Sequence, residues 1–255
     1  MNKRKTGTRE WAEFSYNIGT GCSHGCRYCY ARSIAKRDGK IKSDTEWTSE
    51  KLKTQFPATD KKKGWVMFPT THDITPFYLV PAIETLTKLL ANGNNVLIVS
   101  KPHLECIKAL CETLAFWRGQ ILFRFTIGTS DEDTAKFWEP GAPSIKERLA
   151  CLFWAYKEGF ATSVSMEPML GTVEETLELF DRMSFHVTDK IWIGKMNKVD
   201  SRVVKTDAIV KEKCDRIIAM QSDENILWLI DKLKDHPKVA WKDSIKEVME
   251  KYGKG

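Results

Sequence analysis

Short apolar runs alternate with amphipathic segments along most of this 255-residue chain. The amphipathic segments carry apolar residues every three or four positions, as in Leu79, Ile83, Leu86 and Leu90, which predicts helices with one buried face. The apolar runs have the length of strands. They lie at Trp65 to Phe68, Val96 to Val99 and Ile191 to Ile193, after a first alternating segment at Phe14 to Ile18. Two more polar segments, Ile121 to Ile127 and Thr162 to Met166, are also predicted to be strands.

This alternation predicts an α/β fold with a parallel sheet covered by helices. Right-handed crossovers would curl the sheet into a full or partial barrel, although the periodicity alone equally allows an open doubly wound sheet. We predict one domain over residues 1–200. Residues 201–255 contain three helical segments and a short strand at Val239 to Trp241, and we interpret them as a mainly helical extension packed on the barrel.

The connections carry their own signals. Ser144 to Glu147 and Thr172 to Glu175 both have the Ser/Thr-x-x-Glu pattern of a capping box, which predicts a helix start at each. Tyr30 to Arg37 is predicted to be helical. Residues 40–64 are polar and predict an irregular surface insertion, and the acidic stretch through Glu139 predicts an irregular connection.

Composition adds limits on location. The first residues are polar and basic without an apolar signal core, and no apolar run reaches membrane-spanning length, so we expect a cytoplasmic protein without a membrane partner. An odd number of cysteines, seven, argues against a closed disulfide framework. The other four are scattered along the chain without metal spacing, and we expect them to be buried thiols: Cys106, Cys111, Cys151 and Cys214. The alternative is that one of them donates a hydrogen atom to a substrate.

The net charge is +6, with local excess at Lys3 to Lys5, Lys61 to Lys63 and Lys195 to Lys205. Such runs are found on solvated faces and on nucleic-acid-binding surfaces alike. Charge alone therefore leaves polynucleotide binding open.

Three closely spaced cysteines, Cys22, Cys26 and Cys29, form a C-x3-C-x2-C motif. Four thiolates fill a cubane iron–sulfur cluster or close a zinc site, so three thiolates leave one metal position open. The alternatives are three ordinary buried thiols, or a zinc site with His24 as a cramped fourth ligand. Glycine tolerates positive φ and close approach of a bulky group, and it surrounds the motif at Gly19, Gly21 and Gly25.

The spacing, with Tyr28 directly before Cys29, resembles the signature of the radical S-adenosylmethionine (radical SAM) superfamily. The resemblance implies a partial (β/α)6 barrel, a [4Fe-4S] cluster on the three cysteines and S-adenosyl-L-methionine (SAM) chelated at the open iron. Reductive cleavage of SAM then yields a 5′-deoxyadenosyl radical, which abstracts hydrogen from a substrate. The backbone of Tyr28 is expected to approach the adenine, and a flavodoxin or ferredoxin to supply the electron.

The segment Gly21 to Arg32 is similar to the spore photoproduct lyase-like branch of that superfamily, which includes a DNA repair lyase. The order of further short matches agrees, at Ser100-Lys101, Phe125, Glu139-Pro140, Pro143-Ser144 and Arg148-Leu149. The lyase quenches its substrate radical with a cysteine, and the strand exit Pro69 to Asp73 has none, so we expect a different radical reaction. The usual Gly-Gly-Glu is also absent, which leaves Thr70, Thr71 and His72 to hold the methionine amino group.

Polar residues follow the predicted strands, where a parallel α/β fold places its site. Lys101 is expected to pair with the SAM carboxylate, and Glu167 to accept from a ribose hydroxyl or a substrate donor. His72 is a candidate proton donor or acceptor, with Asp73 beside it, although such residues also cap helices. The other candidates for cofactor binding are Thr70, Thr71, Ser100, Thr126 and Ser165.

The sequence thus predicts a radical SAM enzyme, a lyase or modifying enzyme, whose substrate is unidentified, with nucleic acid or a nucleotide as one candidate. A non-catalytic zinc- or cluster-containing nucleic-acid-binding protein is the alternative. A simple electron carrier is disfavoured because it leaves most of the barrel unexplained.

Overall fold

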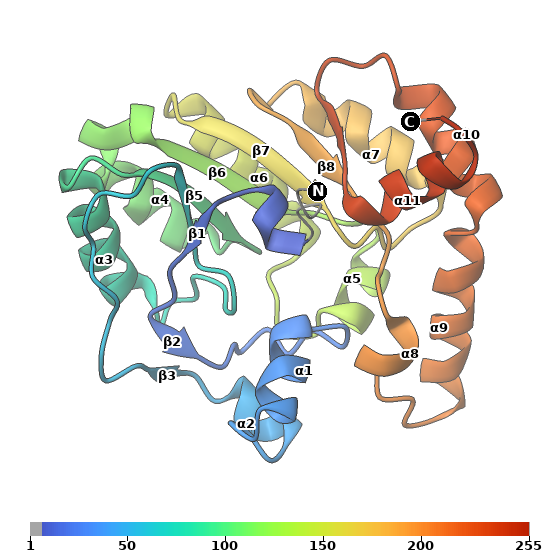
Figure 1. The fold of residues 1–255 in the computed structure, drawn as a ribbon, viewed down its shortest axis with the longest axis horizontal. Coiled ribbons are helices and arrows are strands. Elements are labelled where there is room, and N and C mark those ends of the chain that lie inside the picture. The colour runs from blue at the N-terminus through green and yellow to red at the C-terminus, as the bar shows by residue number, and fades with distance from the viewer. Residues whose placement is uncertain (1–6, 255) are drawn as a thin grey trace.

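The computed structural model describes residues 7–254, so the cluster Lys3 to Lys5 lies outside it. Its centre is a seven-stranded sheet in which all neighbouring strands are parallel (Figure 1). In spatial order the strands are β1 (Phe14–Ser15), β4 (Trp65–Phe68), β5 (Asn95–Ser100), β6 (Ile121–Thr126), β7 (Ala161–Met166), β8 (Ile191–Ile193) and β9 (Val239–Trp241). A separate antiparallel pair joins β2 (Gly19–Thr20) to β3 (Lys51–Leu52).

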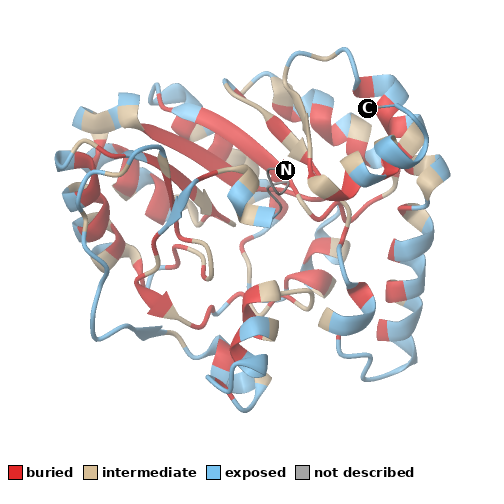
Figure 2. Ribbon diagram, viewed as in Figure 1, coloured by how far each residue is buried: buried red, intermediate tan, exposed pale blue. Residues whose placement is uncertain are grey.

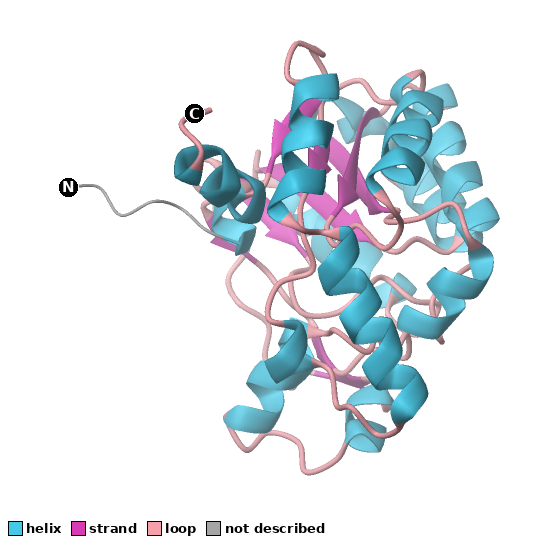
Figure 3. Ribbon diagram, turned by 90° about the vertical axis from the view of Figure 1, so that its right-hand side faces the viewer, coloured by secondary structure: helices cyan, strands magenta, loops and turns pink. Residues whose placement is uncertain are grey.

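Helices cover the outer face of the sheet, where Figure 3 shows them gathered. The main covering helices are α3 (Leu79–Ala91), α4 (Leu104–Thr113), α6 (Ile145–Lys157), α7 (Val173–Ser184) and α10 (Asp223–Leu233). Their apolar faces form one large core with alternate strand residues such as Val96, Ile98, Phe123 and Phe125. The remaining helices are η1 (Gly7–Glu10), α1 (Tyr30–Arg37), α2 (Asp44–Thr48), η2 (Ala115–Gln120), α5 (Glu132–Trp138), α8 (Val199–Arg202), α9 (Ala208–Met220) and α11 (Asp243–Lys251).

The inner face of the sheet is closed by the amino-terminal segment. Ala12 packs on Met67, Leu97 and Leu122, the residues that alternate with the outer-facing set. Beside them the guanidinium of Arg124 lies 4.9 Å from the Trp11 ring and 5.2 Å from the ring of Trp192.

The predicted α/β architecture with parallel strands is confirmed, and the sheet has one strand more than the six expected. Val239–Trp241, which we assigned to the extension, is hydrogen-bonded to β8 as the last strand of the same sheet. The division at residue 200 itself stays a prediction. Within residues 7–254, none of the helices combines the length and apolar character needed to cross a bilayer.

Two stretches expected to be irregular contain short elements. The insertion, residues 40–64, holds α2 and β3 but is otherwise mostly exposed (Figure 2). The connection before Glu139 holds α5, whose amino terminus is capped by the Asp131 carboxylate accepting from the Asp133 and Thr134 amides. Each helix is too short for a repeating apolar pattern, so periodicity did not reveal it.

One predicted capping box is complete and the other is half wrong. At the start of α7 the Thr172 hydroxyl accepts from the Glu175 amide, and the Glu175 carboxylate accepts from the Thr172 amide. Ser144 accepts from the Glu147 amide as expected, but the Glu147 carboxylate accepts instead from the amide of Leu104, 2.8 Å away. Because α4 packs beside α6, one side chain serves the start of the neighbouring helix rather than its own.

A buried lysine joins the two ends of the chain. The ammonium of Lys242, just after β9, lies 2.7 Å from a carboxylate oxygen of Glu10 and 3.4 Å from Glu167, and it donates to the carbonyl of Gly7 at 2.8 Å. It also sits 4.2 Å from the Trp11 ring centre. The side chains of Lys242 and Glu10 are 1% and 4% exposed, so this pair is shielded from water.

Replacing Lys242 with methionine should lower the free energy of unfolding by about 3 kcal/mol, because it takes the buried cation away from Glu10, which keeps only the more exposed Lys246, and from the partly buried Glu167. Lys246→Met is the matched control. Lys246 also pairs with Glu10 but is 41% exposed, so its loss should cost less than about 1 kcal/mol. Urea unfolding followed by circular dichroism measures both. Equal effects of the two substitutions would show that the buried pair does not hold the chain ends together.

Candidate active site

The three cysteines lie on the loop between β2 and α1, beyond the carboxyl ends of the strands. The insertion braces one side of this loop: Cys22 donates its amide to the Trp47 carbonyl at 2.9 Å. Gly21 has φ of +90°, and a Cβ there would lie 2.5 Å from the Ser49 carbonyl oxygen, so glycine is required. On the other side the Arg27 amide donates to the Trp138 carbonyl at the end of α5.

All three motif cysteines are free thiols that line one cavity of about 460 Å³. Cys22 and Cys26 are buried and Cys29 is half-buried, where its sulfur accepts from the Arg32 amide at the start of α1. Burial raises the pKa of Cys26 to about 12. The metal-free thiol is therefore protonated at neutral pH, and a bound metal must displace that proton.

The alternation of strand residues decides which polar groups face the cavity. Lys101, Thr126, Ser165 and Glu167 continue the inner-facing positions of β5, β6 and β7, and all four line it. Ser100 has the opposite parity and is not among the described residues that line the cavity. Its hydroxyl accepts from the Ile74 amide at 3.1 Å, on the side of the covering helices. The structure thus separates the predicted pair Ser100 and Lys101.

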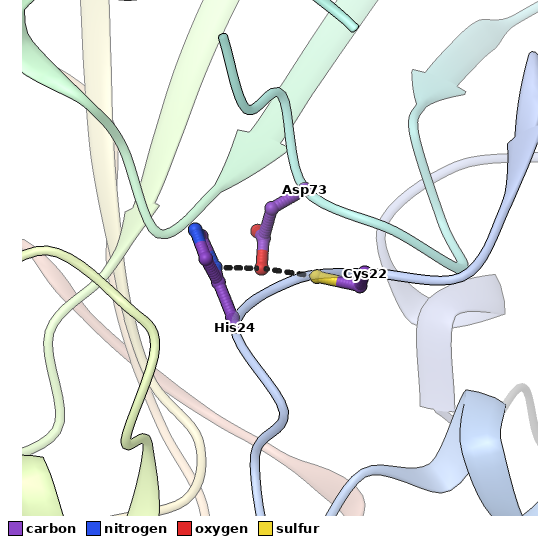
Figure 4. A group of neighbouring side chains, drawn as sticks. All are labelled: Cys22, His24 and Asp73. Atoms are coloured by element: carbon purple, nitrogen blue, oxygen red, sulfur yellow. Dashed lines mark hydrogen bonds and ion pairs between the residues drawn. The ribbon is translucent and has the colours of Figure 1, made fainter. Parts of the chain in front are cut away.

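Asp73 connects the cysteine loop to two strand ends (Figure 4). Its Oδ2 lies 2.8 Å from His24 Nδ1 and 3.7 Å from the Cys22 sulfur, and its Oδ1 accepts from the Lys101 amide at 2.7 Å. Burial alone would raise the pKa of Asp73, but Lys101 and His24 outweigh it and hold the pKa well below its usual range. Asp73 is therefore an ionised carboxylate at the cavity wall.

His24 is fully buried behind this carboxylate. Its second ring nitrogen, Nε2, lies 3.0 Å from Nε2 of His103. The ligand atoms of Cys22, His24 and Asp73 all lie within 4.8 Å of one another. These three side chains form a second group with the chemistry of a metal site, and it shares Cys22 with the motif.

The predicted proton-transfer residue His72 lines the cavity, but main-chain groups occupy its ring. Its Nε2 accepts from the Gly19 amide at 3.2 Å, and its Nδ1 donates to the Asp73 carbonyl at 2.9 Å. Burial lowers the pKa of His72, so the ring is neutral near pH 7. Proton transfer by His72 stays a prediction and requires one of these bonds to break.

Thr70 and Thr71 also line the cavity, and Asn17 fixes their backbone. Its side-chain oxygen accepts from the amides of Thr70 at 2.7 Å and Thr71 at 2.9 Å. The Thr70 hydroxyl accepts from the Asn17 side-chain amide at 2.6 Å. These contacts make the strand exit rigid.

Glu139, to which sequence reasoning assigned no chemistry, contacts two residues of the cavity wall, Tyr28 and Lys101. It is 1% exposed, pairs with Arg148 at 2.5 Å and accepts from the hydroxyl of Tyr28. The Lys101 ammonium lies 3.9 Å from Glu139 and 5.6 Å from the Tyr28 ring centre. Burial opposes the charge of Lys101, but its acidic neighbours outweigh burial and raise its pKa well above the ordinary value. The one sequence feature that pointed to Glu139 was the pair Glu139-Pro140, one of the short matches to the spore photoproduct lyase-like branch.

Glu167 lies at the far side of the cavity. Burial raises the pKa of Glu167, although the ion pair with Lys242 counteracts this. No sequence pattern indicated that Lys242, far along the chain, supports this carboxylate. Arg9 and Arg202 also line the cavity and were not predicted as site residues. Lys195 and Asn197 line it as well, at the exit of β8, where polar residues after a strand were expected to contribute to the site.

The family model of the radical SAM superfamily matches residues 16–183, well over half of the chain. The protein belongs to the radical SAM superfamily, a superfamily of enzymes, and the predicted resemblance is confirmed at that level.

The chain is similar to one curated protein in sequence and to several solved structures in fold. The uncharacterized protein ORF301 of Acidianus two-tailed virus is 28% identical over 185 residues, which span 65% of this chain and 61% of that protein. A spore photoproduct lyase mutant with bound AdoMet and dinucleoside spore photoproduct has a TM-score of 0.55 at 14% identity, covering 90% of this chain and 76% of the lyase. Streptococcus suis SuiB bound to precursor peptide SuiA has a TM-score of 0.58 at 13% identity. That match covers 94% of this chain and 51% of SuiB.

The residues present fit the cluster that the superfamily implies. Three free thiols open onto a shared cavity, so one metal position would face empty space rather than a fourth protein sulfur. Gly25, with φ of +57°, also lines the cavity and leaves the loop without a side chain there.

Substituting Glu139 with glutamine should lower the free energy of unfolding by about 3 kcal/mol, because Arg148 then stays buried without a carboxylate. Tyr28→Phe is the matched control, since it removes one hydrogen bond to the same carboxylate and keeps the ion pair. Its cost should be about 1 to 2 kcal/mol. Thermal and urea unfolding measure both. A Glu139→Gln protein as stable as wild type would contradict a charged Glu139–Arg148 pair.

Proposed function

We propose that this protein is a radical SAM enzyme in which Cys22, Cys26 and Cys29 hold a [4Fe-4S] cluster. The observation that carries the proposal is the arrangement of these three free, largely buried thiols around one end of a 460 Å³ cavity. When bound and reduced by a flavodoxin or ferredoxin, the cluster supplies the electron that splits SAM into methionine and a hydrogen-abstracting 5′-deoxyadenosyl radical. The chain's own residues would bind SAM, orient it and shield the reaction from water.

Opposite charges on the cavity wall match the two charged groups of a methionine moiety. The Lys101 ammonium suits the carboxylate, and the ionised Asp73 suits the amino group. Asp73 thereby takes the part that we first assigned to Thr70, Thr71 and His72, because an ionised carboxylate attracts an ammonium group more strongly than a neutral hydroxyl or imidazole does.

The hydroxyl and carboxylate groups across the cavity suit a nucleoside. The Ser165 hydroxyl is buried and has no hydrogen-bond partner among residues 7–254, and it lines the cavity beside Thr126. Glu167 can accept from ribose hydroxyls, and Tyr28 lines the same cavity. We therefore propose these four residues as the adenosyl side of the site.

A mononuclear metal protein is a second candidate, favoured by the convergence of Cys22, His24 and Asp73. It predicts one zinc per chain and no labile sulfide. In that case Cys26 and Cys29 would be simple buried thiols. Metal and sulfide analysis of purified protein separates the two candidates.

Anaerobically reconstituted protein should contain four irons and four sulfides per chain and should release 5′-deoxyadenosine when SAM and dithionite are added. Alanine at any one of Cys22, Cys26 or Cys29 should abolish both the cluster absorbance and this release. Cys106→Ala, at another buried thiol, should keep both. Well-loaded wild-type protein that forms no 5′-deoxyadenosine, or loss of the cluster in the Cys106 variant alone, would refute the assignment.

Lys101→Met should raise the dissociation constant of SAM by about tenfold or more, because a charge-assisted bond is lost from a half-buried site. Ser100→Ala is the matched control on the opposite face of the same strand end, and it should change SAM affinity less than about twofold. Equilibrium dialysis against the reconstituted proteins measures both. The same loss at both positions would mean that Lys101 does not contact SAM.

A further inference from the structure

We propose that the substrate carries a phosphate ester, bound by Arg202 where the cavity opens into a cationic groove between α1 and α8. This inference rests on the proposed function, since it concerns the substrate of the same site. It names the chemistry that would recognise the substrate and the surface along which the substrate would lie.

The groove is a second hollow of about 280 Å³. One wall is a face of α1, with Arg32, Lys36 and Arg37. The other wall comes from α8, which ends at Arg202. Figure 1 shows α1 and α8 on the same side of the molecule, beyond the ends of the strands. Arg202 also lines the main cavity, so the two hollows meet at this side chain.

Positive charge exceeds negative charge in the groove. Asp44 is shared by Arg32 at 3.5 Å and Lys36 at 3.3 Å, so one carboxylate faces two cations. Arg37 pairs with Asp38. Half-buried Arg202 has no carboxylate within ion-pair distance among residues 7–254. It acts electrostatically on Glu167 in the cavity but forms no direct pair with it, so its guanidinium is available to an external anion. A guanidinium binds phosphate or carboxylate oxygens in pairs, and several cations together favour the more highly charged phosphate.

The size of the cavity indicates why a substrate would reach the groove. Pockets for one small ligand measure roughly 300 to 1,000 Å³, and this cavity of about 460 Å³ must hold SAM as well as the reacting part of the substrate. The rest of a substrate must therefore lie outside. A mononucleotide needs only Arg202 for its phosphate, whereas a nucleic-acid strand would place further phosphates along Arg37 and Lys36.

The test measures binding to reconstituted protein with SAM and without reductant, using thymidine 5′-monophosphate and a short fluorescent thymidylate strand. Arg202→Gln should weaken both by about tenfold, and Arg202→Lys should restore part of the affinity. If the substrate is a strand, Lys36→Gln should also lower the slope of log affinity against log salt by about 0.7. If it is a mononucleotide, Lys36→Gln leaves binding unchanged.

Lys88→Gln, at an exposed lysine on α3 away from both hollows, is the charge-matched control and should change nothing. Equal binding by wild type and Arg202→Gln would overturn the proposal. So would the absence of binding to either phosphate ligand at low salt, or equally tight binding of an aspartate-rich peptide. Because no reductant is present, the result is independent of SAM cleavage: missing 5′-deoxyadenosine would refute the proposed function and leave this binding result standing.

Discussion

The contact between one carboxylate and the cysteine loop organises the site. Asp73 follows β4, and it bonds to His24 on the loop, to the amide of Lys101 after β5 and to the sulfur of Cys22. These bonds hold the three thiols against the carboxyl ends of the strands, where a parallel sheet gathers its exit residues. A charged carboxylate is stable in this buried position because its partners supply positive charge and hydrogen bonds.

The packing of the amino-terminal segment on the inner face of the sheet depends on a different set of buried charges. Lys242 brings together the amino-terminal segment and the last strand, and it reaches Glu167 at the cavity floor. Arg124, between Trp11 and Trp192, fills the inner face where a fully apolar core would be expected. The residues after 200 therefore help to build the site: β9 extends the sheet, and α8 contributes Arg202 to the cavity lining.

Much of this arrangement could be predicted from the sequence. The apolar runs located β4, β5 and β8 because strands of a covered parallel sheet are rich in apolar residues. The period of two along β5 also distinguishes Lys101 from Ser100, although the polar character of both hid the difference at first. Glu139 and Glu147 could not be assigned, because their partners come from other helices and such long-range pairs leave no local pattern. Short α5 escaped detection because seven residues are too few for a repeating apolar pattern, although its end braces the cysteine loop.

The central claim is that three protein thiols leave one metal position open to the cavity. Mössbauer spectroscopy of protein reconstituted with iron-57, recorded with and without SAM, tests it most directly. The account predicts that one of the four iron sites changes its isomer shift and quadrupole splitting when SAM is added, while the others stay as they were. Spectra that do not respond to SAM, or a protein that retains a single zinc ion instead of iron, would contradict it.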